Sequence, residues 1–328
     1  MPESTQKTIK RFLPLIGISL FAVIVARIGV RQFFEALISV NIPLLGYAAG
    51  LTLLYLLVQT VRWQTILASQ GIAETPFPVL FLIQVKSVFY GIISPARLGS
   101  FIKVMLLQDT SSAPPAKVLS GIVAERLLDL ITMAFLASLG ALFFLQQRHI
   151  AWAAGALLIL FVVVLSLFPK KDLWRKLFRK AFYFIVPEAY QENARSVCND
   201  FFNVAPRISQ LCVPFVLSLV NWWLIYSQMF LISRAFNIAV PYVEFLLLMP
   251  ITTVIALMPV TVAGLGTKEI TLLYLFRHYA DSPEKIVSFS VTNTVLVFCI
   301  YGILFLSASI LYPVIRKRSM KKSTEEEQ

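Results

Sequence analysis

Two basic residues stand beside a break in a long apolar run, where they could bind an anion such as a phosphate. Arg97 and Lys103 flank Gly99, and Pro95 comes just before them. A guanidinium can bind phosphate through two parallel hydrogen bonds. A helix that restarts after the break would direct free N–H groups at the anion, and glycine allows close approach of the backbone. Arg97, Gly99 and Lys103 are therefore candidate substrate-binding residues; the alternative is that the two cations mark the cytoplasmic end of a hairpin.

A second apolar run has the same design. It breaks at Pro259 and continues through Gly264 and Gly266 to Lys268 and Glu269. Irregular backbone within a membrane is tolerated only where it is buried in protein or lines a cavity. Two such breaks in corresponding halves of a chain point to a transporter-like binding site. We therefore assign Gly264, Gly266, Lys268 and Glu269 to substrate binding as well; close helix packing is the alternative role of the glycines.

Three charged residues, Glu125, Arg126 and Asp129, precede the apolar run 130–145. That run of 16 residues is shorter than the roughly 20 that a membrane span needs, so the trio is expected inside the cytoplasmic half of the membrane. In a helix, Glu125 and Asp129 share a face and Arg126 can reach Asp129. Because charges inside a membrane usually neutralise one another, we interpret the trio as supporting charges that hold the first broken segment against its neighbour.

The composition indicates an all-α polytopic membrane protein. Hydrophobic residues make up 58% of the chain and charged residues 14%, and the mean hydropathy is +0.78. A soluble protein normally has about 25% charged residues. The net charge of +12 is concentrated beside apolar spans, at the N-terminus, in residues 170–180 and at the C-terminus. Basic residues favour the cytoplasmic side of a span, so this pattern predicts a cytoplasmic (inner) membrane location with both termini in the cytoplasm, rather than nucleic-acid binding.

The chain is expected to contain two membrane halves and about six full spans. The predicted parts are a first membrane half (1–168, with the broken segment 76–108), a basic amphipathic cytoplasmic linker (169–210), a second membrane half (211–312, with the broken segment 241–280) and a charged cytoplasmic tail (313–328). The predicted spans are 12–26, 44–62, 130–145, 150–168, 211–234 and 286–312.

The predicted topology relates the two halves to each other. Termini on the same side require an even number of crossings, so the two broken segments, read as re-entrant hairpins, open on opposite sides of the membrane. This arrangement is an inverted repeat, which is common in alternating-access transporters. Gln59 and Arg62, at the end of the span 44–62, are interpreted as residues of the membrane boundary, with a polar connection at 63–75; the alternative is that they line the transport path.

The ordered motifs resemble a known family. The motifs are Pro95-x-Arg97-x-Gly99, Lys103, Glu125-Arg126-x-x-Asp129, Pro259 and Gly264-x-Gly266-x-Lys268-Glu269. From about residue 10 to 312, the chain resembles the transmembrane region of lysylphosphatidylglycerol synthases, which stand-alone flippase-like proteins share. The resemblance implies a lipid-translocating unit for an anionic, aminoacylated or polyprenyl-linked lipid.

Two departures from the family pattern qualify that implication. Ser100 stands where the family usually has an acidic residue, so a role that needs a carboxylate in the first hairpin is in doubt. Only a short charged tail follows Tyr312, so the aminoacyl-transferring domain of the synthases is absent and lipid aminoacylation is not expected.

A lipid flippase-like transporter without a catalytic residue, metal or cofactor is the function that these patterns favour. Its expected ligand is a membrane phospholipid or lipid-linked substrate. One alternative is an integral-membrane transferase acting on a lipid-linked substrate, with Glu125, Asp129 and Glu269 as acid–base candidates. Another is a membrane scaffold for an envelope-lipid synthase, with residues 170–182 as the docking surface. Whether the protein forms a homodimer or binds a partner lipid synthase is left open.

Overall fold

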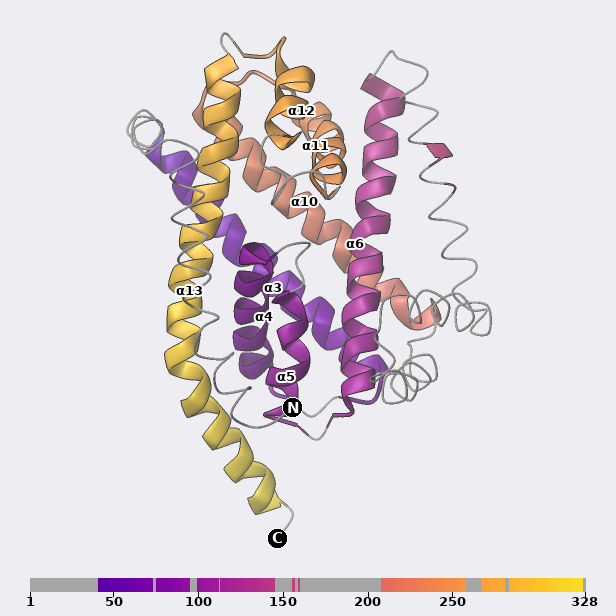
Figure 1. Ribbon diagram of the computed structural model, residues 1–328, viewed down its shortest axis with the longest axis vertical. Helices are drawn as coiled ribbons and strands as arrows, with labels where there is room; N and C mark the ends of the chain where they lie inside the picture. The colour runs from indigo at the N-terminus through magenta and orange to yellow at the C-terminus, as the bar shows by residue number, and fades with distance from the viewer. Residues whose placement is uncertain are drawn as a thin grey trace, which may run out of the picture.

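The computed structural model describes residues 41–72, 75–94, 99–111, 113–144, 155–156, 159, 208–257, 267–280 and 283–326 (Figure 1). These residues form helices and turns, and none of them is in a strand. Four helices are long and apolar enough to cross a membrane: α3 (Ile42–Ser69), α6 (Pro115–Phe144), α10 (Cys212–Ala235) and the first two thirds of α13 (Pro283–Glu326). The shorter helices are α4 (Phe77–Ile93), α5 (Ile102–Gln108), the 3-10 helix η3 (Ile208–Leu211), α11 (Tyr242–Leu257) and α12 (Thr267–Phe276). The predicted all-α polytopic membrane class is confirmed.

Several predicted features lie outside the described residues. They are the span 12–26, most of the span 150–168, nearly all of the linker 169–210, and the candidate site residues Arg97, Gly264 and Gly266. The division into two halves, a linker and a tail stays a prediction. Within the described part, the span predicted at 211–234 corresponds to α10, and the last span continues as one helix to Glu326.

Helix α3 is longer than predicted. It begins at an N-cap, Asn41, whose side chain accepts a hydrogen bond from the Leu44 amide, and it ends at Ser69 rather than at 62. A polar connection was predicted from residue 63, but Trp63 is fully buried and the helix continues with an inward apolar face. Gly71, with φ +76°, then closes a Schellman motif in which the Ile72 amide donates to the Leu67 carbonyl.

The first broken segment is a helix, a break and a short returning helix. Helix α4 ends at Ile93 and α5 begins at Ile102. The Gly99 amide donates to the Ser94 hydroxyl (2.6 Å), and the Ser87 hydroxyl donates to the Ser100 carbonyl (3.0 Å). A Cβ on Gly99 would lie 2.1 Å from the Tyr90 carbonyl oxygen, so the return requires glycine at this position.

The second broken segment has the same outline, with α11 ending at Leu257 and α12 beginning at Thr267. The two segments pack on different parts of α13, the first on the middle of the helix and the second near its N-terminal end. Phe89 of α4 stacks on Phe305 (4.3 Å between ring centroids), whereas Phe245 of α11 contacts Phe289. In Figure 1, α11 and α12 lie in the upper part of the molecule, and α4 and α5 lie below them, toward the half of α13 that leads to the C-terminus. This is the placement expected of hairpins that open on opposite membrane faces.

Candidate functional site: a buried charge network

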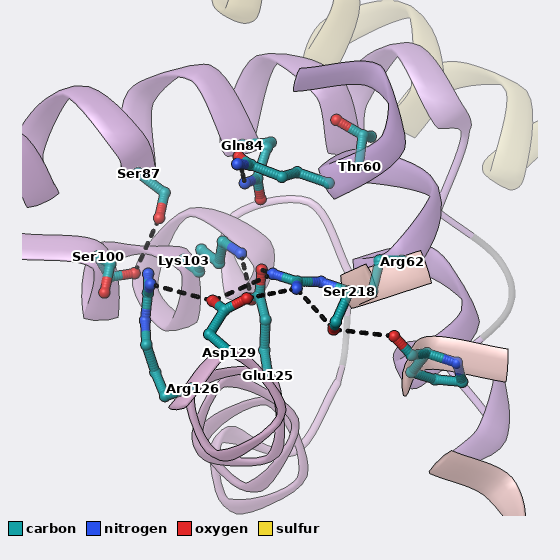
Figure 2. Close-up of polar contacts among 12 residues, drawn as sticks. Thr60, Arg62, Gln84, Ser87, Ser100, Lys103, Glu125, Arg126, Asp129 and Ser218 are labelled. Carbon is teal, nitrogen blue, oxygen red and sulfur yellow. Dashed lines mark hydrogen bonds and ion pairs between the residues drawn. The ribbon is translucent and has the colours of Figure 1, made fainter. Parts of the chain in front are cut away.

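Arg62 of α3 lies at the centre of a polar network inside the helix bundle (Figure 2). Its Nη1 donates to Asp129 Oδ1 (2.6 Å) and to Ser218 Oγ (2.8 Å), and its Nη2 donates to Glu125 Oε1 (2.8 Å). The arginine is only 1% exposed. One guanidinium therefore connects two carboxylates of α6 with a hydroxyl of α10.

Lys103 of α5 forms an ion pair with the second carboxylate oxygen of Glu125. Its Nζ lies 2.7 Å from Glu125 Oε2, and the same ammonium lies 4.5 Å from the centroid of the Trp63 ring. Cation–π attraction of this kind strengthens when the cation is removed from water. Lys103 is fully buried, so its charge is balanced by a carboxylate and an aromatic face.

Asp129 has three donors around it. Besides Arg62, it accepts a hydrogen bond from Trp222 Nε1 of α10 (3.0 Å) and forms an ion pair with Arg126, whose Nη1 lies 3.7 Å from Asp129 Oδ2. The side chain of Arg126 is 30% exposed. We call Arg62, Lys103, Glu125, Arg126 and Asp129 the charge network.

Helices α3, α5 and α6 carry the residues of the charge network, and α10 contacts it through Ser218 and Trp222. Glu125 and Asp129 are one turn apart on α6, and Ser218 and Trp222 are one turn apart on α10, so each pair shares a helix face. The break after α4 turns the chain back and presents Lys103 on α5. Because α3, α5 and α6 precede residue 145 and α10 follows residue 211, the network joins the two predicted membrane halves.

Such a network is a weak source of stability. A buried ion pair can be replaced by apolar residues without loss of stability, because desolvating the charges offsets their attraction. A single unpaired charge at the centre of a membrane helix costs about 2.5–3.5 kcal/mol on insertion scales. Charged side chains inside a membrane bundle are therefore candidates for function in substrate or ion pathways.

Glu125, Arg126 and Asp129 make ion pairs of the kind that their predicted supporting role needs, and that role stays a prediction. The Lys103–Glu125 ion pair ties the first broken segment to α6, as expected, and Arg126 reaches Asp129 at a spacing of three residues. Lys103 was predicted to bind substrate, and its ammonium is engaged by Glu125. Direct contact of Lys103 with a ligand stays a prediction.

The second group of predicted site residues lies elsewhere in the bundle. Glu269, in the first turn of α12, accepts a hydrogen bond from Ser290 of α13 (2.7 Å), and Lys268 precedes it. Helix α12 lies in the upper part of Figure 1, whereas α5 lies in the lower part. The described residues thus contain two separate polar regions, one beside each broken segment.

Sequence reasoning missed three members of the polar centre: Arg62, Ser218 and Trp222. Arg62 follows an apolar run and was interpreted as a boundary residue. The available signal was the apolar face that continues through Trp63, Ile66 and Leu67, all of which are fully buried. That face places Arg62 inside a longer helix. Within the described ranges, no group of three or more His, Cys, Asp or Glu side chains could hold a metal ion.

These helices and their buried charged side chains define a polytopic α-helical membrane protein with a charged centre. Residues 14–321 match the family described as "Lysylphosphatidylglycerol synthase TM region", and the chain belongs to that family. A UPF0104 membrane protein of Pyrococcus horikoshii is 24% identical over 310 residues, which cover 86% of this chain and 90% of the relative. The resemblance inferred from the motifs is thereby confirmed.

Proposed function

We propose that this protein is a flippase-like transporter that moves the polar headgroup of a lipid across the cytoplasmic membrane. The observation that carries the proposal is the charge network, buried between helices of both halves. A lipid headgroup loses its hydration when it enters the bilayer, and this penalty falls where fixed protein charges replace water. The substrate class is an anionic, aminoacylated or polyprenyl-linked lipid.

The two broken segments support a transport cycle. Each lies within an apolar stretch, and they pack on different parts of α13, the first on its middle and the second near its N-terminal end. In transporters with inverted repeats, broken helices line a central site that opens alternately to each side. The charge network holds α3, α5, α6 and α10 together in one arrangement, so a change of access has to alter some of these contacts.

The proposal includes a topology and no covalent chemistry. The basic clusters at both termini favour a cytoplasmic position for each end. The lipid is the transported partner, and its acyl chains remain in the bilayer while the headgroup crosses.

Headgroup transfer in proteoliposomes tests the proposal. Unmodified protein should speed the transfer of a fluorescent phosphatidylglycerol between leaflets, as measured by chemical quenching of the outer leaflet. Glu125→Gln removes the carboxylate shared by Arg62 and Lys103 and should lower the rate at least tenfold, by analogy with the roughly 3–5 kcal/mol cost of breaking a buried ion pair.

Glu244→Gln is the matched control. Glu244 lies in the first turn of α11 and accepts a hydrogen bond from Tyr279, away from the charge network. This variant should transfer lipid at the unmodified rate. Equal transfer in protein-free vesicles and in vesicles with folded unmodified protein would refute the transporter assignment.

A further inference from the structure

The formal charges of the network do not cancel. Arg62, Lys103 and Arg126 supply three positive charges, and Glu125 and Asp129 supply two negative charges, which leaves a net charge of +1. At membrane depth an uncompensated cation is costly, and such groups normally find a counter-charge. Among the described residues, these ion pairs therefore leave one positive charge of the network without a counter-charge.

The internal partners are unevenly shared among the three cations. Arg62 and Lys103 make contacts of 2.6–2.8 Å with the carboxylates and are almost fully buried. Arg126 lies 3.7 Å from Asp129, which exceeds the length of a hydrogen bond. Its Nε is buried and has no hydrogen-bond partner among the described residues. An arginine carries five N–H donors in a rigid fork, so Arg126 has the capacity to bind a further acceptor.

Arg126 is also the accessible member of the network. Its side chain is 30% exposed, compared with 2% for Arg62 and 1% for Lys103. Leu130, one turn further along α6, is 37% exposed, so this side of the helix faces out of the bundle. Figure 2 shows Arg126 and Arg62 approaching the carboxylates from opposite sides. Arg126 is thus the member of the network that a ligand outside the bundle can contact without displacing Arg62.

We propose that the Arg126 guanidinium binds the phosphate of the transported lipid, and that the other four charges hold Arg126 in place. The ligand class is a lipid with a phosphodiester headgroup, whose single negative charge balances the +1 of the network. Arginine binds two phosphate oxygens through parallel N–H···O bonds. This assignment rests on the proposed transport function and names the contact that the function requires.

Lipid binding to purified protein tests the assignment separately from transport. Native mass spectrometry in a neutral detergent would measure binding of phosphatidylglycerol, of diacylglycerol with the same acyl chains, and of inorganic phosphate. Unmodified protein should bind phosphatidylglycerol and should bind diacylglycerol far less. Arg126→Gln should weaken phosphatidylglycerol binding at least about tenfold, as expected when a charged hydrogen-bonded contact is lost, and Arg126→Lys should retain part of it.

Arg234→Gln provides the matched control. Arg234 lies in the last turn of α10 and is exposed, so the variant removes one arginine without changing the network and should bind phosphatidylglycerol normally. The thermal unfolding midpoint of lipid-free Arg126→Gln should be close to that of the unmodified protein. This result would show that Arg126 acts as a ligand contact and is not needed as a structural partner of Asp129.

Three results would overturn the assignment. Normal phosphatidylglycerol binding by Arg126→Gln would show that another group holds the phosphate. Equal binding of diacylglycerol would remove the phosphate from recognition, and equal occupancy by inorganic phosphate would exclude a lipid-specific site. If the first result occurs while Glu125→Gln still abolishes transfer, the phosphate assignment fails and the transport function stands; absence of transfer by the unmodified protein would refute the function itself.

Discussion

At the scale of single residues, the type of the central cation matters as much as its charge. Arg62 reaches Glu125, Asp129 and Ser218 at once because a guanidinium presents several donors in one plane. A lysine has one nitrogen on a flexible stem and cannot bridge the three groups with the same geometry. The network therefore depends on arginine at position 62.

Arg62→Lys should accordingly be destabilising although it keeps the charge. We expect the free energy of unfolding to fall by about 1–3 kcal/mol, because at least one buried acceptor loses its donor. Arg62→Gln should cost more, about 3–5 kcal/mol, since it leaves two carboxylates with reduced compensation. Reversible unfolding in mixed detergent micelles would measure both. Equal stability of Arg62→Lys and unmodified protein would contradict the requirement for a planar donor group.

At the scale of helices, two glycines permit backbone contacts that no larger residue allows. Gly99 lies against the Tyr90 carbonyl inside the first broken segment, and a Cβ on Gly140 of α6 would lie 1.9 Å from the Leu247 carbonyl oxygen of α11. Small residues allow such close approach between membrane helices. Because Leu247 belongs to the second broken segment, Gly140 sets how closely that segment packs against α6.

Gly140→Ala should therefore push α6 and α11 apart. Overpacking of this kind typically costs about 1–3 kcal/mol, and a clash with backbone belongs at the upper end of that range. Gly50→Ala in α3 is the control, because nothing lies within 4 Å of its added Cβ and alanine is the better helix former by roughly 1 kcal/mol. Thermal unfolding of the two variants should thus shift in opposite directions, and a stable Gly140→Ala protein would rule out the tight crossing.

At the scale of the whole molecule, two apolar clusters lie at opposite ends of the bundle. One contains residues of α3, α4 and the middle of α13, including Phe305, and the other contains residues of α11, α12 and the N-terminal part of α13, including Phe289. The two clusters meet at Ile225 of α10, which packs against both of them.

The predicted opposite orientation of the broken segments can be tested by thiol labelling. Gln108 is the last residue of the return helix α5 and His278 follows α12, and both are exposed. In a background without the three native cysteines, Gln108→Cys should react with an impermeant maleimide only from the cytoplasmic side. His278→Cys should react only from the outer side. Labelling of both positions from one side would disprove the inverted arrangement of the hairpins.

Local patterns in the chain were sufficient to predict the protein class, the two breaks and part of the network. Hydropathy and charge content follow directly from composition, and Pro and Gly within apolar runs mark where a helix is interrupted. The pairing of Arg126 with Asp129 needs only helical spacing. These properties depend on residues that are close together in the chain, so the sequence by itself determined them.

The tertiary structure alone decided which distant groups meet. Arg62 binds Asp129 across 67 positions and Ser218 across 156, and no periodicity encodes such a pair. Whether Arg62 is a boundary residue or a buried bridge depends on how α3, α6 and α10 cross, because packing determines which charges leave water and which partners compensate them. The net charge of +1 on the network likewise follows only from knowing which charged side chains the fold brings together.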